Sequence, residues 1–369
     1  MAIKIFSTSH LSILPSQAVS LIRLNIFKRL NRDSFEYWTT LDEGIELGGS
    51  IFRIPVPSKN RLLKYFGRLC WLWKTKPDII IFSGEFLDIL FYFFRPRKSK
   101  LVLHLNGPVP HPLKDYPFRN FRFDLLWRSV VFFAKRVDYI LTISRYAAAS
   151  LKPFKLAAKI DVIYNGVDLK QFQPEKRDKT YLKKKFGLDD SRKIFSFIGA
   201  LILRKRPQLF IELAKSFSEI QFVLVGRNNP ETDLSKEISQ TKNVFWIKEM
   251  SRNDVAILLA SSDLFIFPSL FEGFGMVVAE AMASGCPVVA SSASGPEELF
   301  QGGCGIMVSI KQNEQEEIKE FTLVIENLMS EPEKMKKMSL DAREQALKKF
   351  DWDDLAAKWQ QCLEKYAPQ

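Results

Sequence analysis

The sequence predicts an α/β protein built of two doubly wound parallel sheets, each in a domain of its own. The chain has 369 residues, which is too long for one ordinary hydrophobic core and fits two domains of about 150 to 200 residues. Short apolar runs, typical of strands buried on both faces, alternate with helix-compatible segments in both halves. Such alternation predicts parallel sheets covered by helices.

The predicted strands divide between the two halves. They cover residues 3–7, 77–82, 100–104 and 137–144 in the first half, and 193–199, 222–226, 243–250, 263–267 and 288–290 in the second. We expect an N-terminal domain over 1–173 and a C-terminal domain over 174–350, joined by a linker near 171–179. A closing helix over about 351–369 is expected to pack back on the first domain.

Residues 263–290 carry the most informative pattern, a strand, a glycine-rich turn, a helix and a second strand. Gly273 and Gly275 let the backbone approach a ligand closely, and the free amides at the start of the helix over 276–284 attract an anion such as phosphate. Glu272 and Glu280 bracket this turn, and carboxylates are good acceptors for hydroxyl groups. The segment therefore predicts a site for a ligand that carries both a phosphate and sugar hydroxyls.

The same segment resembles the signature of a known enzyme family. Glu272 and Glu280, with the strings Pro-Ser-x-x-Glu-Gly-Phe-Gly and Ala-x-Gly-x-Pro-Val-Val-Ala around them, are similar to the motif of the retaining GT-B glycosyltransferases of family 4, also called group 1. The alternative is a βαβ unit of an unrelated doubly wound domain. The resemblance implies two Rossmann-like domains facing across a cleft, with an acceptor-binding first domain and a nucleotide-sugar-binding second domain.

The resemblance also assigns donor-site residues. Lys205 matches the basic residue that relatives place on the donor diphosphate, and Ala200 stands where many relatives have arginine, so Arg204 or Arg206 is the candidate replacement. Glu272 is expected to contact the donor sugar, and Glu280 the ribose. The other expected donor-binding residues are Gly199, Gly226, Lys248, Met250, Gly273, Phe274 and Gly275.

In the first half the resemblance is weaker. Relatives place a histidine at the end of the third strand, and this sequence offers His104 or Asn106 there as a catalytic residue. Both lie on one face if the strand continues, so the choice stays open. Ser16 and Gln17 stand in a loop where relatives often carry Gly-Gly, and with Ser144 they are expected on the acceptor side.

The positive charge is concentrated in the first half. Residues 1–174 contain 27 Lys and Arg against 13 Asp and Glu, whereas the remainder contains 27 against 29. Basic residues alternate with aromatic ones over 64–74 and 91–100, a pattern that suits docking on an anionic membrane surface. The alternatives are that Trp71 and Trp73 belong to the core, or that this surface binds nucleic acid, but no RRM, KH or zinc pattern accompanies it.

The cysteines and the Asp-x-Asp pattern bear on the cellular location and on metal binding. Four scattered cysteines form no CxxC pair, and we expect no signal peptide, so the predicted location is the cytoplasm, at the inner face of the membrane. Asp351 and Asp353 form an Asp-x-Asp that reads as a helix start, so no metal and no cofactor are expected. The predicted reaction moves a sugar from a UDP-, GDP- or ADP-sugar to a lipid-linked or cell-envelope saccharide. A catalytically silent scaffold is the alternative.

Overall fold

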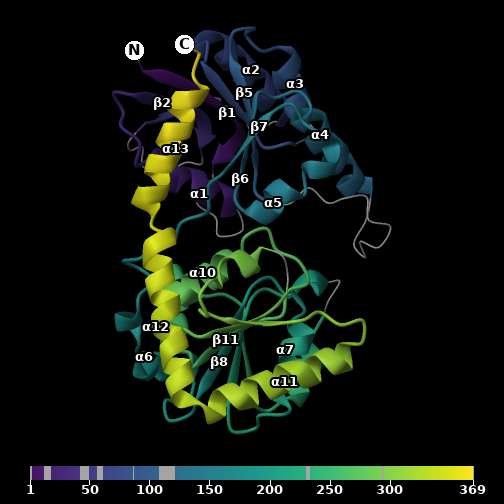
Figure 1. Ribbon diagram of the computed structural model, residues 1–369, viewed down its shortest axis with the longest axis vertical. Helices are drawn as coiled ribbons and strands as arrows, with labels where there is room; N and C mark the ends of the chain where they lie inside the picture. The colour runs from purple at the N-terminus through teal and green to yellow at the C-terminus, as the bar shows by residue number, and fades with distance from the viewer. Residues whose placement is uncertain are drawn as a thin grey trace. The chain divides into compact units, whose positions relative to one another are not determined.

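The computed structural model describes residues 2–11, 18–41, 50–55, 61–85, 87–107, 121–229, 233–292 and 295–368. The chain forms two compact units, each with its own parallel sheet (Figure 1). Unit 1 comprises Met1–Gly166 and Trp352–Gln369, and unit 2 comprises Val167–Asp351. The predicted class of α/β protein with two parallel sheets is confirmed.

Unit 1 contains a seven-stranded sheet in the order β3-β2-β1-β4-β5-β6-β7, and all of its pairings are parallel. Along β4, Ile79 and Ile81 face one core and Ile80 and Phe82 face the other, as a strand buried on both sides requires. The strands are β1 Ile3–Leu11, β2 Phe35–Leu41, β3 Ile51–Arg53, β4 Ile79–Phe82, β5 Lys100–Leu105, β6 Tyr139–Thr142 and β7 Lys159–Val162. The helices are α1 Ala18–Phe27, α2 Arg61–Thr75, α3 Asp88–Phe93, α4 Phe121–Ala134, α5 Arg145–Ala149 and α13 Trp352–Tyr366.

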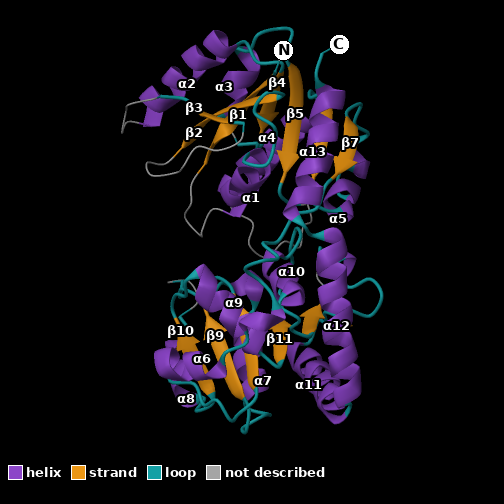
Figure 2. Cartoon of the chain, turned by 90° about the vertical axis from the view of Figure 1, so that its left-hand side faces the viewer, coloured by secondary structure: helices purple, strands orange, loops and turns teal. Residues whose placement is uncertain are grey.

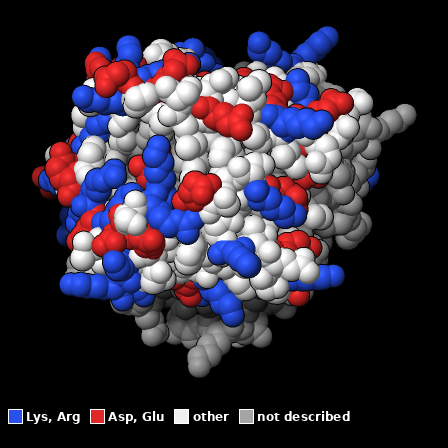
Figure 3. Space-filling model, turned by 90° about the horizontal axis from the view of Figure 1, so that it is seen from below, with Lys and Arg blue, Asp and Glu red and all other residues white. Residues whose placement is uncertain are grey.

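Unit 2 contains a six-stranded parallel sheet in the order β10-β9-β8-β11-β12-β13, with helices on both faces (Figure 2). Its strands are β8 Ile194–Ile198, β9 Gln221–Val225, β10 Val244–Ile247, β11 Leu264–Phe267, β12 Val288–Ser291 and β13 Ile306–Val308. Its helices are α6 Lys179–Phe186, α7 Pro207–Ala214, α8 Ser235–Gln240, α9 Arg252–Ser261, α10 Met276–Ala283, α11 Glu314–Ser330 and α12 Pro332–Lys349. On the end of the molecule seen in Figure 3, cations and carboxylates are interspersed.

The first boundary between the units lies after Gly166, earlier than the predicted residue 173. The backbone N–H of Val167 donates to the carbonyl of Phe350 at 2.7 Å. Phe172 is fully buried, and its carbonyl accepts a hydrogen bond from Arg343 at 2.9 Å. These contacts hold the segment in unit 2, because each partner belongs to that unit.

Helix α13 closes unit 1. Trp359 packs edge-on against Phe27 of α1, with ring centroids 5.8 Å apart. Gly166 lies so close to Trp352 that a Cβ there would stand 2.4 Å from the indole, so only glycine fits. Asp353, one half of the Asp-x-Asp, forms an ion pair with Arg29 at 2.7 Å.

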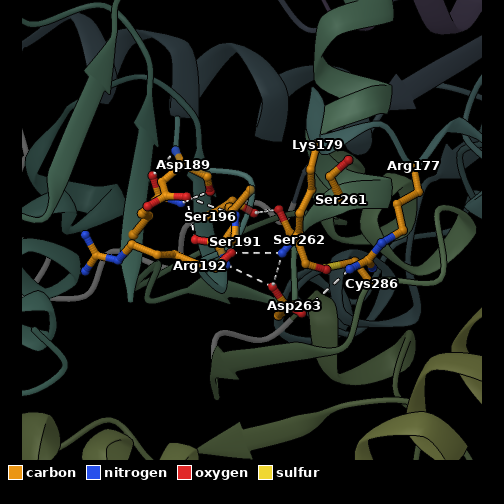
Figure 4. Close-up of polar contacts among 12 residues, drawn as sticks. Arg177, Lys179, Asp189, Ser191, Arg192, Ser196, Ser261, Ser262, Asp263 and Cys286 are labelled. Atoms are coloured by element: carbon orange, nitrogen blue, oxygen red, sulfur yellow. Dashed lines mark hydrogen bonds and ion pairs between the residues drawn. The ribbon is translucent and has the colours of Figure 1, made fainter. Parts of the chain in front are cut away.

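A polar cluster ties the amino-terminal edge of the unit 2 sheet together (Figure 4). Asp263, just before β11, accepts from the backbone N–H of Ile194 at 2.9 Å and from Lys179 at 3.3 Å. Ser262 donates to Ser196 at 2.8 Å. This edge lies opposite the carboxyl ends of the strands, where ligands bind in doubly wound sheets.

Candidate functional site

The predicted donor residues follow the carboxyl ends of the unit 2 strands. Gly199 follows β8, Gly226 follows β9, Lys248 follows β10 and Glu272 follows β11. Because carboxyl ends of parallel strands share one edge of the sheet, residues far apart in the sequence come together there. This edge is the candidate site.

The centre of the site is a cluster of two cations on one carboxylate. Glu272 Oε1 lies 2.6 Å from Lys205 Nζ and 2.7 Å from Arg204 Nη1. Ser269 Oγ donates to the same oxygen at 3.3 Å. The backbone joins the two loops as well, because the N–H of Leu270 donates to the carbonyl of Arg204 at 2.9 Å.

Burial and charge act against each other on Glu272. Burial raises the pKa of this carboxyl, but Lys205 and Arg204 lower it more, so the net pKa lies below the usual value. Glu272 is therefore ionised at neutral pH. Two positive side chains beside one carboxylate leave the cluster with a net charge of about +1, which suits an anionic ligand.

Glycines shape the backbone around this cluster. Gly275 has φ +86° at the start of α10, a conformation that favours glycine. Gly226 approaches Gly199 so closely that an added Cβ would lie 1.9 Å from the Gly199 carbonyl oxygen. Gly295, which we did not predict from the sequence, lies against the Glu272 and Gly273 carbonyls, and its N–H donates to the former at 3.1 Å.

Glu280 lies in α10 and is almost completely buried. Its Oε1 lies 2.7 Å from Arg252 Nη1 of α9. Burial raises the pKa of Glu280, and Arg252 only partly offsets that effect. Arg252 was not predicted, since nothing in its local sequence indicates a partner 28 residues away.

The end of β10 carries an indole ring, and charged side chains lie next to it in the loops after β9 and β10. Lys248 Nζ lies 5.3 Å from the Trp246 ring centroid, and Trp246 Nε1 donates to the Gly226 carbonyl at 2.8 Å. Arg227 and Glu249 form an exposed ion pair at 2.8 Å. Met250 is partly buried and packs against the core cluster between the sheet and helices α6 and α9.

Two side chains of residues named for the donor site are buried in structural contacts. Phe274 is buried and packs edge-on against Phe350, with ring centroids 5.6 Å apart. This contact holds the glycine turn on the core of unit 2. Arg206 is buried against Glu317, so it does not offer a cation to a diphosphate. Arg204, which lies beside Lys205 on Glu272, is the better candidate to replace the arginine missing at Ala200.

The candidate catalytic residues of unit 1 differ in exposure. His104 is buried, its ring meets Trp359 at 90° with centroids 5.0 Å apart, and its Nδ1 accepts from Arg23 at 3.3 Å. Burial and the Arg23 charge lower the pKa of His104 well below its usual value. His104 is therefore a neutral, buried residue, and its catalytic assignment stays a prediction. Asn106 is partly exposed beyond β5, and its buried Oδ1 has no hydrogen-bond partner among the described residues.

The acceptor-side predictions are tested only in part. Ser144 is buried, and its Oγ caps α5 by accepting from the N–H of Ala147 at 3.0 Å. This contact gives Ser144 a structural role, and its place on the acceptor side stays a prediction. Ser16 and Gln17 lie outside the described residues. Within the described ranges, no group of three or more His, Cys, Asp and Glu residues is arranged to hold a metal ion.

The fold and the site define an α/β protein of two Rossmann-like units, the second of which carries two cations on one carboxylate at the carboxyl edge of its sheet. The model of Glycosyl transferases group 1 matches residues 178–345, and that of Glycosyltransferase Family 4 matches residues 29–171. Together the two models match most of the chain. The protein belongs to this glycosyltransferase family, and its fold is GT-B.

Individual relatives agree with this family. An MMP α-(1→4)-mannosyltransferase from Mycolicibacterium hassiacum is 30% identical over 238 residues, which is 63% of this chain and 55% of that protein. The matched segment thus spans about half the length of the curated relative. Anabaena HepE, solved with UDP and glucose, superposes with a TM-score of 0.76 at 19% identity over 99% of this chain and 100% of that one. WaaG, a glycosyltransferase involved in lipopolysaccharide biosynthesis, gives 0.67 at 14% identity over 100% of both chains.

Proposed function

We propose that the protein is a retaining, metal-independent hexosyltransferase that uses a UDP-, GDP- or ADP-sugar. The observation that carries the proposal is the Lys205–Glu272–Arg204 cluster at the carboxyl edge of the unit 2 sheet. The two cations stabilise the charge that builds on the departing diphosphate, which is electrostatic preorganisation. Glu272 accepts from a hydroxyl of the donor sugar, and Glu280 accepts from the ribose.

The proposed acceptor is a hydroxyl of a lipid-linked or cell-envelope saccharide. The role of WaaG in lipopolysaccharide biosynthesis is a property of that neighbour, and it supports such an acceptor. Asn106 is the proposed catalytic residue of unit 1, because its Oδ1 has no hydrogen-bond partner among the described residues.

The first test is thermal stabilisation by a panel of nucleotide sugars and free nucleotides without added metal. A ligand that binds the folded state raises the melting temperature by mass action. We expect one nucleotide class to stand out, and the shift to shrink in Glu280→Gln but not in Glu326→Gln, an exposed carboxylate on α11. No shift with any nucleotide would favour a silent scaffold instead. The anomeric configuration of the product, read by NMR, then tests retention.

We also propose that unit 1 docks on the anionic inner face of the cytoplasmic membrane. Helices α2 and α3 lie side by side (Figures 1 and 2), and their rings meet where Tyr65 and Phe91 lie 6.1 Å apart. Trp71 is partly buried and stacks on Trp38 against the core, whereas Trp73 is 54% exposed. Other large apolar side chains exposed on and beside the two helices are Leu63, Phe66, Phe93 and Phe94.

Cations lie over partly buried rings of the same two helices. Lys74 Nζ lies 4.3 Å from the Trp71 ring centroid, and the Arg95 guanidinium lies 4.1 Å from that of Tyr92. Aromatic side chains that enter the headgroup region beside cations are typical of peripheral binding. Across the parts of the chain that the structure describes, no helix is both long and apolar enough to span a bilayer.

Vesicle sedimentation tests the docking surface. We expect binding to vesicles of phosphatidylglycerol and phosphatidylcholine, weak binding to phosphatidylcholine alone, and loss of binding in Phe66→Ala/Trp73→Ala. Leu323→Ala/Leu340→Ala removes equally exposed apolar side chains from unit 2 and serves as the matched control. Equal binding by both double variants would remove α2 from the proposed surface.

A further inference from the structure

Arg206 occupies a special position in the chain. It follows the 3-10 turn Leu203–Lys205 and precedes α7. Its φ is +50°, a backbone conformation that residues other than glycine rarely adopt. Its side chain is 6% exposed. A strained backbone and a buried cation are each costly, so the surroundings must stabilise both.

The guanidinium of Arg206 is held on three sides. Nη1 and Nη2 donate to the two carboxylate oxygens of Glu317, at 2.8 and 2.6 Å. Nη2 also donates to Ser291 Oγ at 2.7 Å, and Nε donates to the Pro268 carbonyl at 2.7 Å. Glu317 is fully buried in the first turn of α11 and accepts in addition from the N–H of Lys311 at 3.2 Å.

These contacts join the segments that carry the site. Pro268 follows β11 directly and stands four residues before Glu272, whereas Arg206 follows Lys205 directly. Ser291 ends β12. The guanidinium therefore fixes the loop after β8 to the loop after β11, and those two loops supply the cation and the carboxylate of the central cluster.

We propose that the Arg206–Glu317 pair is a positioning device for the donor site, which holds Lys205 against Glu272. The inference rests on the proposed function only in its kinetic consequence. Arg206 does not touch the donor; it acts through its chain neighbour Lys205 and through the Pro268 carbonyl. Preorganised cations need fixed positions, and a displacement of about 1 Å can cost roughly 100-fold in rate.

A double substitution separates positioning from folding. Removal of one partner leaves a buried unpaired charge, so Arg206→Met alone is expected to unfold or to destabilise the protein severely. Arg206→Met/Glu317→Leu replaces both charges by apolar side chains of similar volume, a change that often preserves stability. It still removes the link from Nε to the Pro268 carbonyl.

The experiment compares this double variant with wild type and with Lys183→Met/Asp190→Leu, which removes an exposed ion pair. We expect both double variants to melt as cooperatively as wild type. In the Arg206→Met/Glu317→Leu variant, called the clamp variant below, we expect kcat to fall about 10- to 100-fold with a smaller change in KM. We also expect the Glu272 pKa, followed by carbon NMR of the labelled carboxyl group, to rise toward its ordinary value as Lys205 moves away.

The two readouts separate the two proposals. Wild type that neither binds nor transfers from any nucleotide sugar would refute the proposed function, while the Glu272 titration would still decide the role of the clamp. A folded clamp variant with wild-type kcat and an unchanged Glu272 pKa would overturn the positioning role. A clamp variant that does not fold even with both charges removed would overturn it too, since the pair would then be needed for the fold itself.

Discussion

Glu272→Gln should make the protein bind a free nucleoside diphosphate more tightly while it transfers sugar more slowly. In the structure, the Glu272 carboxylate lies on the two cations, Lys205 and Arg204, that we assign to the diphosphate. A bound diphosphate must therefore share or displace that carboxylate. Glutamine keeps the shape of the side chain and removes the competing charge.

The geometry gives the size of the effect. Opposite charges at the observed 2.6 and 2.7 Å attract by roughly 6 kcal/mol per pair at an effective dielectric constant of about 20. Desolvation cancels most of this attraction, and the side chains are 14–27% exposed. The net stabilisation that a diphosphate must give up when it displaces the carboxylate is therefore about 1 to 2 kcal/mol per ion pair. The diphosphate recovers part of that energy, which predicts roughly 10- to 30-fold tighter binding.

Calorimetric titration of the preferred nucleoside diphosphate, without metal, measures this change. Glu326→Gln alters the net charge equally on an exposed part of α11 and should leave affinity unchanged. Turnover of the Glu272 variant should fall at least 100-fold if the carboxylate contacts the sugar only in the transition state. Equal or weaker diphosphate binding by Glu272→Gln would refute the competition.

Two further predictions concern buried carboxyl groups. Arg252→Gln should weaken nucleotide binding about tenfold near pH 6 and less at pH 8. Burial raises the Glu280 pKa and Arg252 opposes that rise, so the substitution lets the pKa rise further. Calorimetry at both pH values measures the change, and a loss of affinity that does not depend on pH would contradict the prediction. Asp88 of unit 1 is buried, and burial, offset only in part by a hydrogen bond with Thr8, raises its pKa to about 6. The folded pKa lies above the unfolded one, so the stabilisation present below about pH 4 is lost as the pH rises to 6, by up to roughly 3 kcal/mol. Denaturant unfolding should show this loss in wild type relative to Asp88→Asn; parallel pH profiles would contradict it.

Local patterns accounted for the strands that carry the site. A run such as residues 263–267 is apolar throughout because the strand is buried on both faces, and the glycines that follow it mark the turn. Strands β2, β3, β7 and β13 were not predicted, and all of them except β2 lie at the edge of a sheet. In β7 the side chains are exposed or half-buried, so it lacks the continuous apolar run by which buried strands are found.

Long-range pairing accounts for what the sequence did not show. Arg206 stood in a basic run that suits a diphosphate, but its partner Glu317 lies 111 residues away on another helix. Arg252 likewise meets Glu280 through packing of α9 beside α10. The sequence around His104 likewise does not show that Trp359, from the last helix, packs against its ring. Such contacts depend on tertiary packing, which spacing along the chain does not encode.

The side chains of the two glutamates of the site are 14% and 6% exposed, and their pKa values are shifted in opposite directions for a physical reason. Glu272 meets two cations and its pKa is lowered, whereas Glu280 meets one and its pKa is raised. Glu272 is thus the fixed negative charge of the site, and Glu280 is the group whose ionisation a ligand can change. A ribose hydroxyl that donates to Glu280 stabilises its charged form, because hydrogen bonds to a carboxylate lower its pKa. Donor binding should therefore release a fraction of a proton from Glu280, and the amount should fall as the pH of the buffer rises.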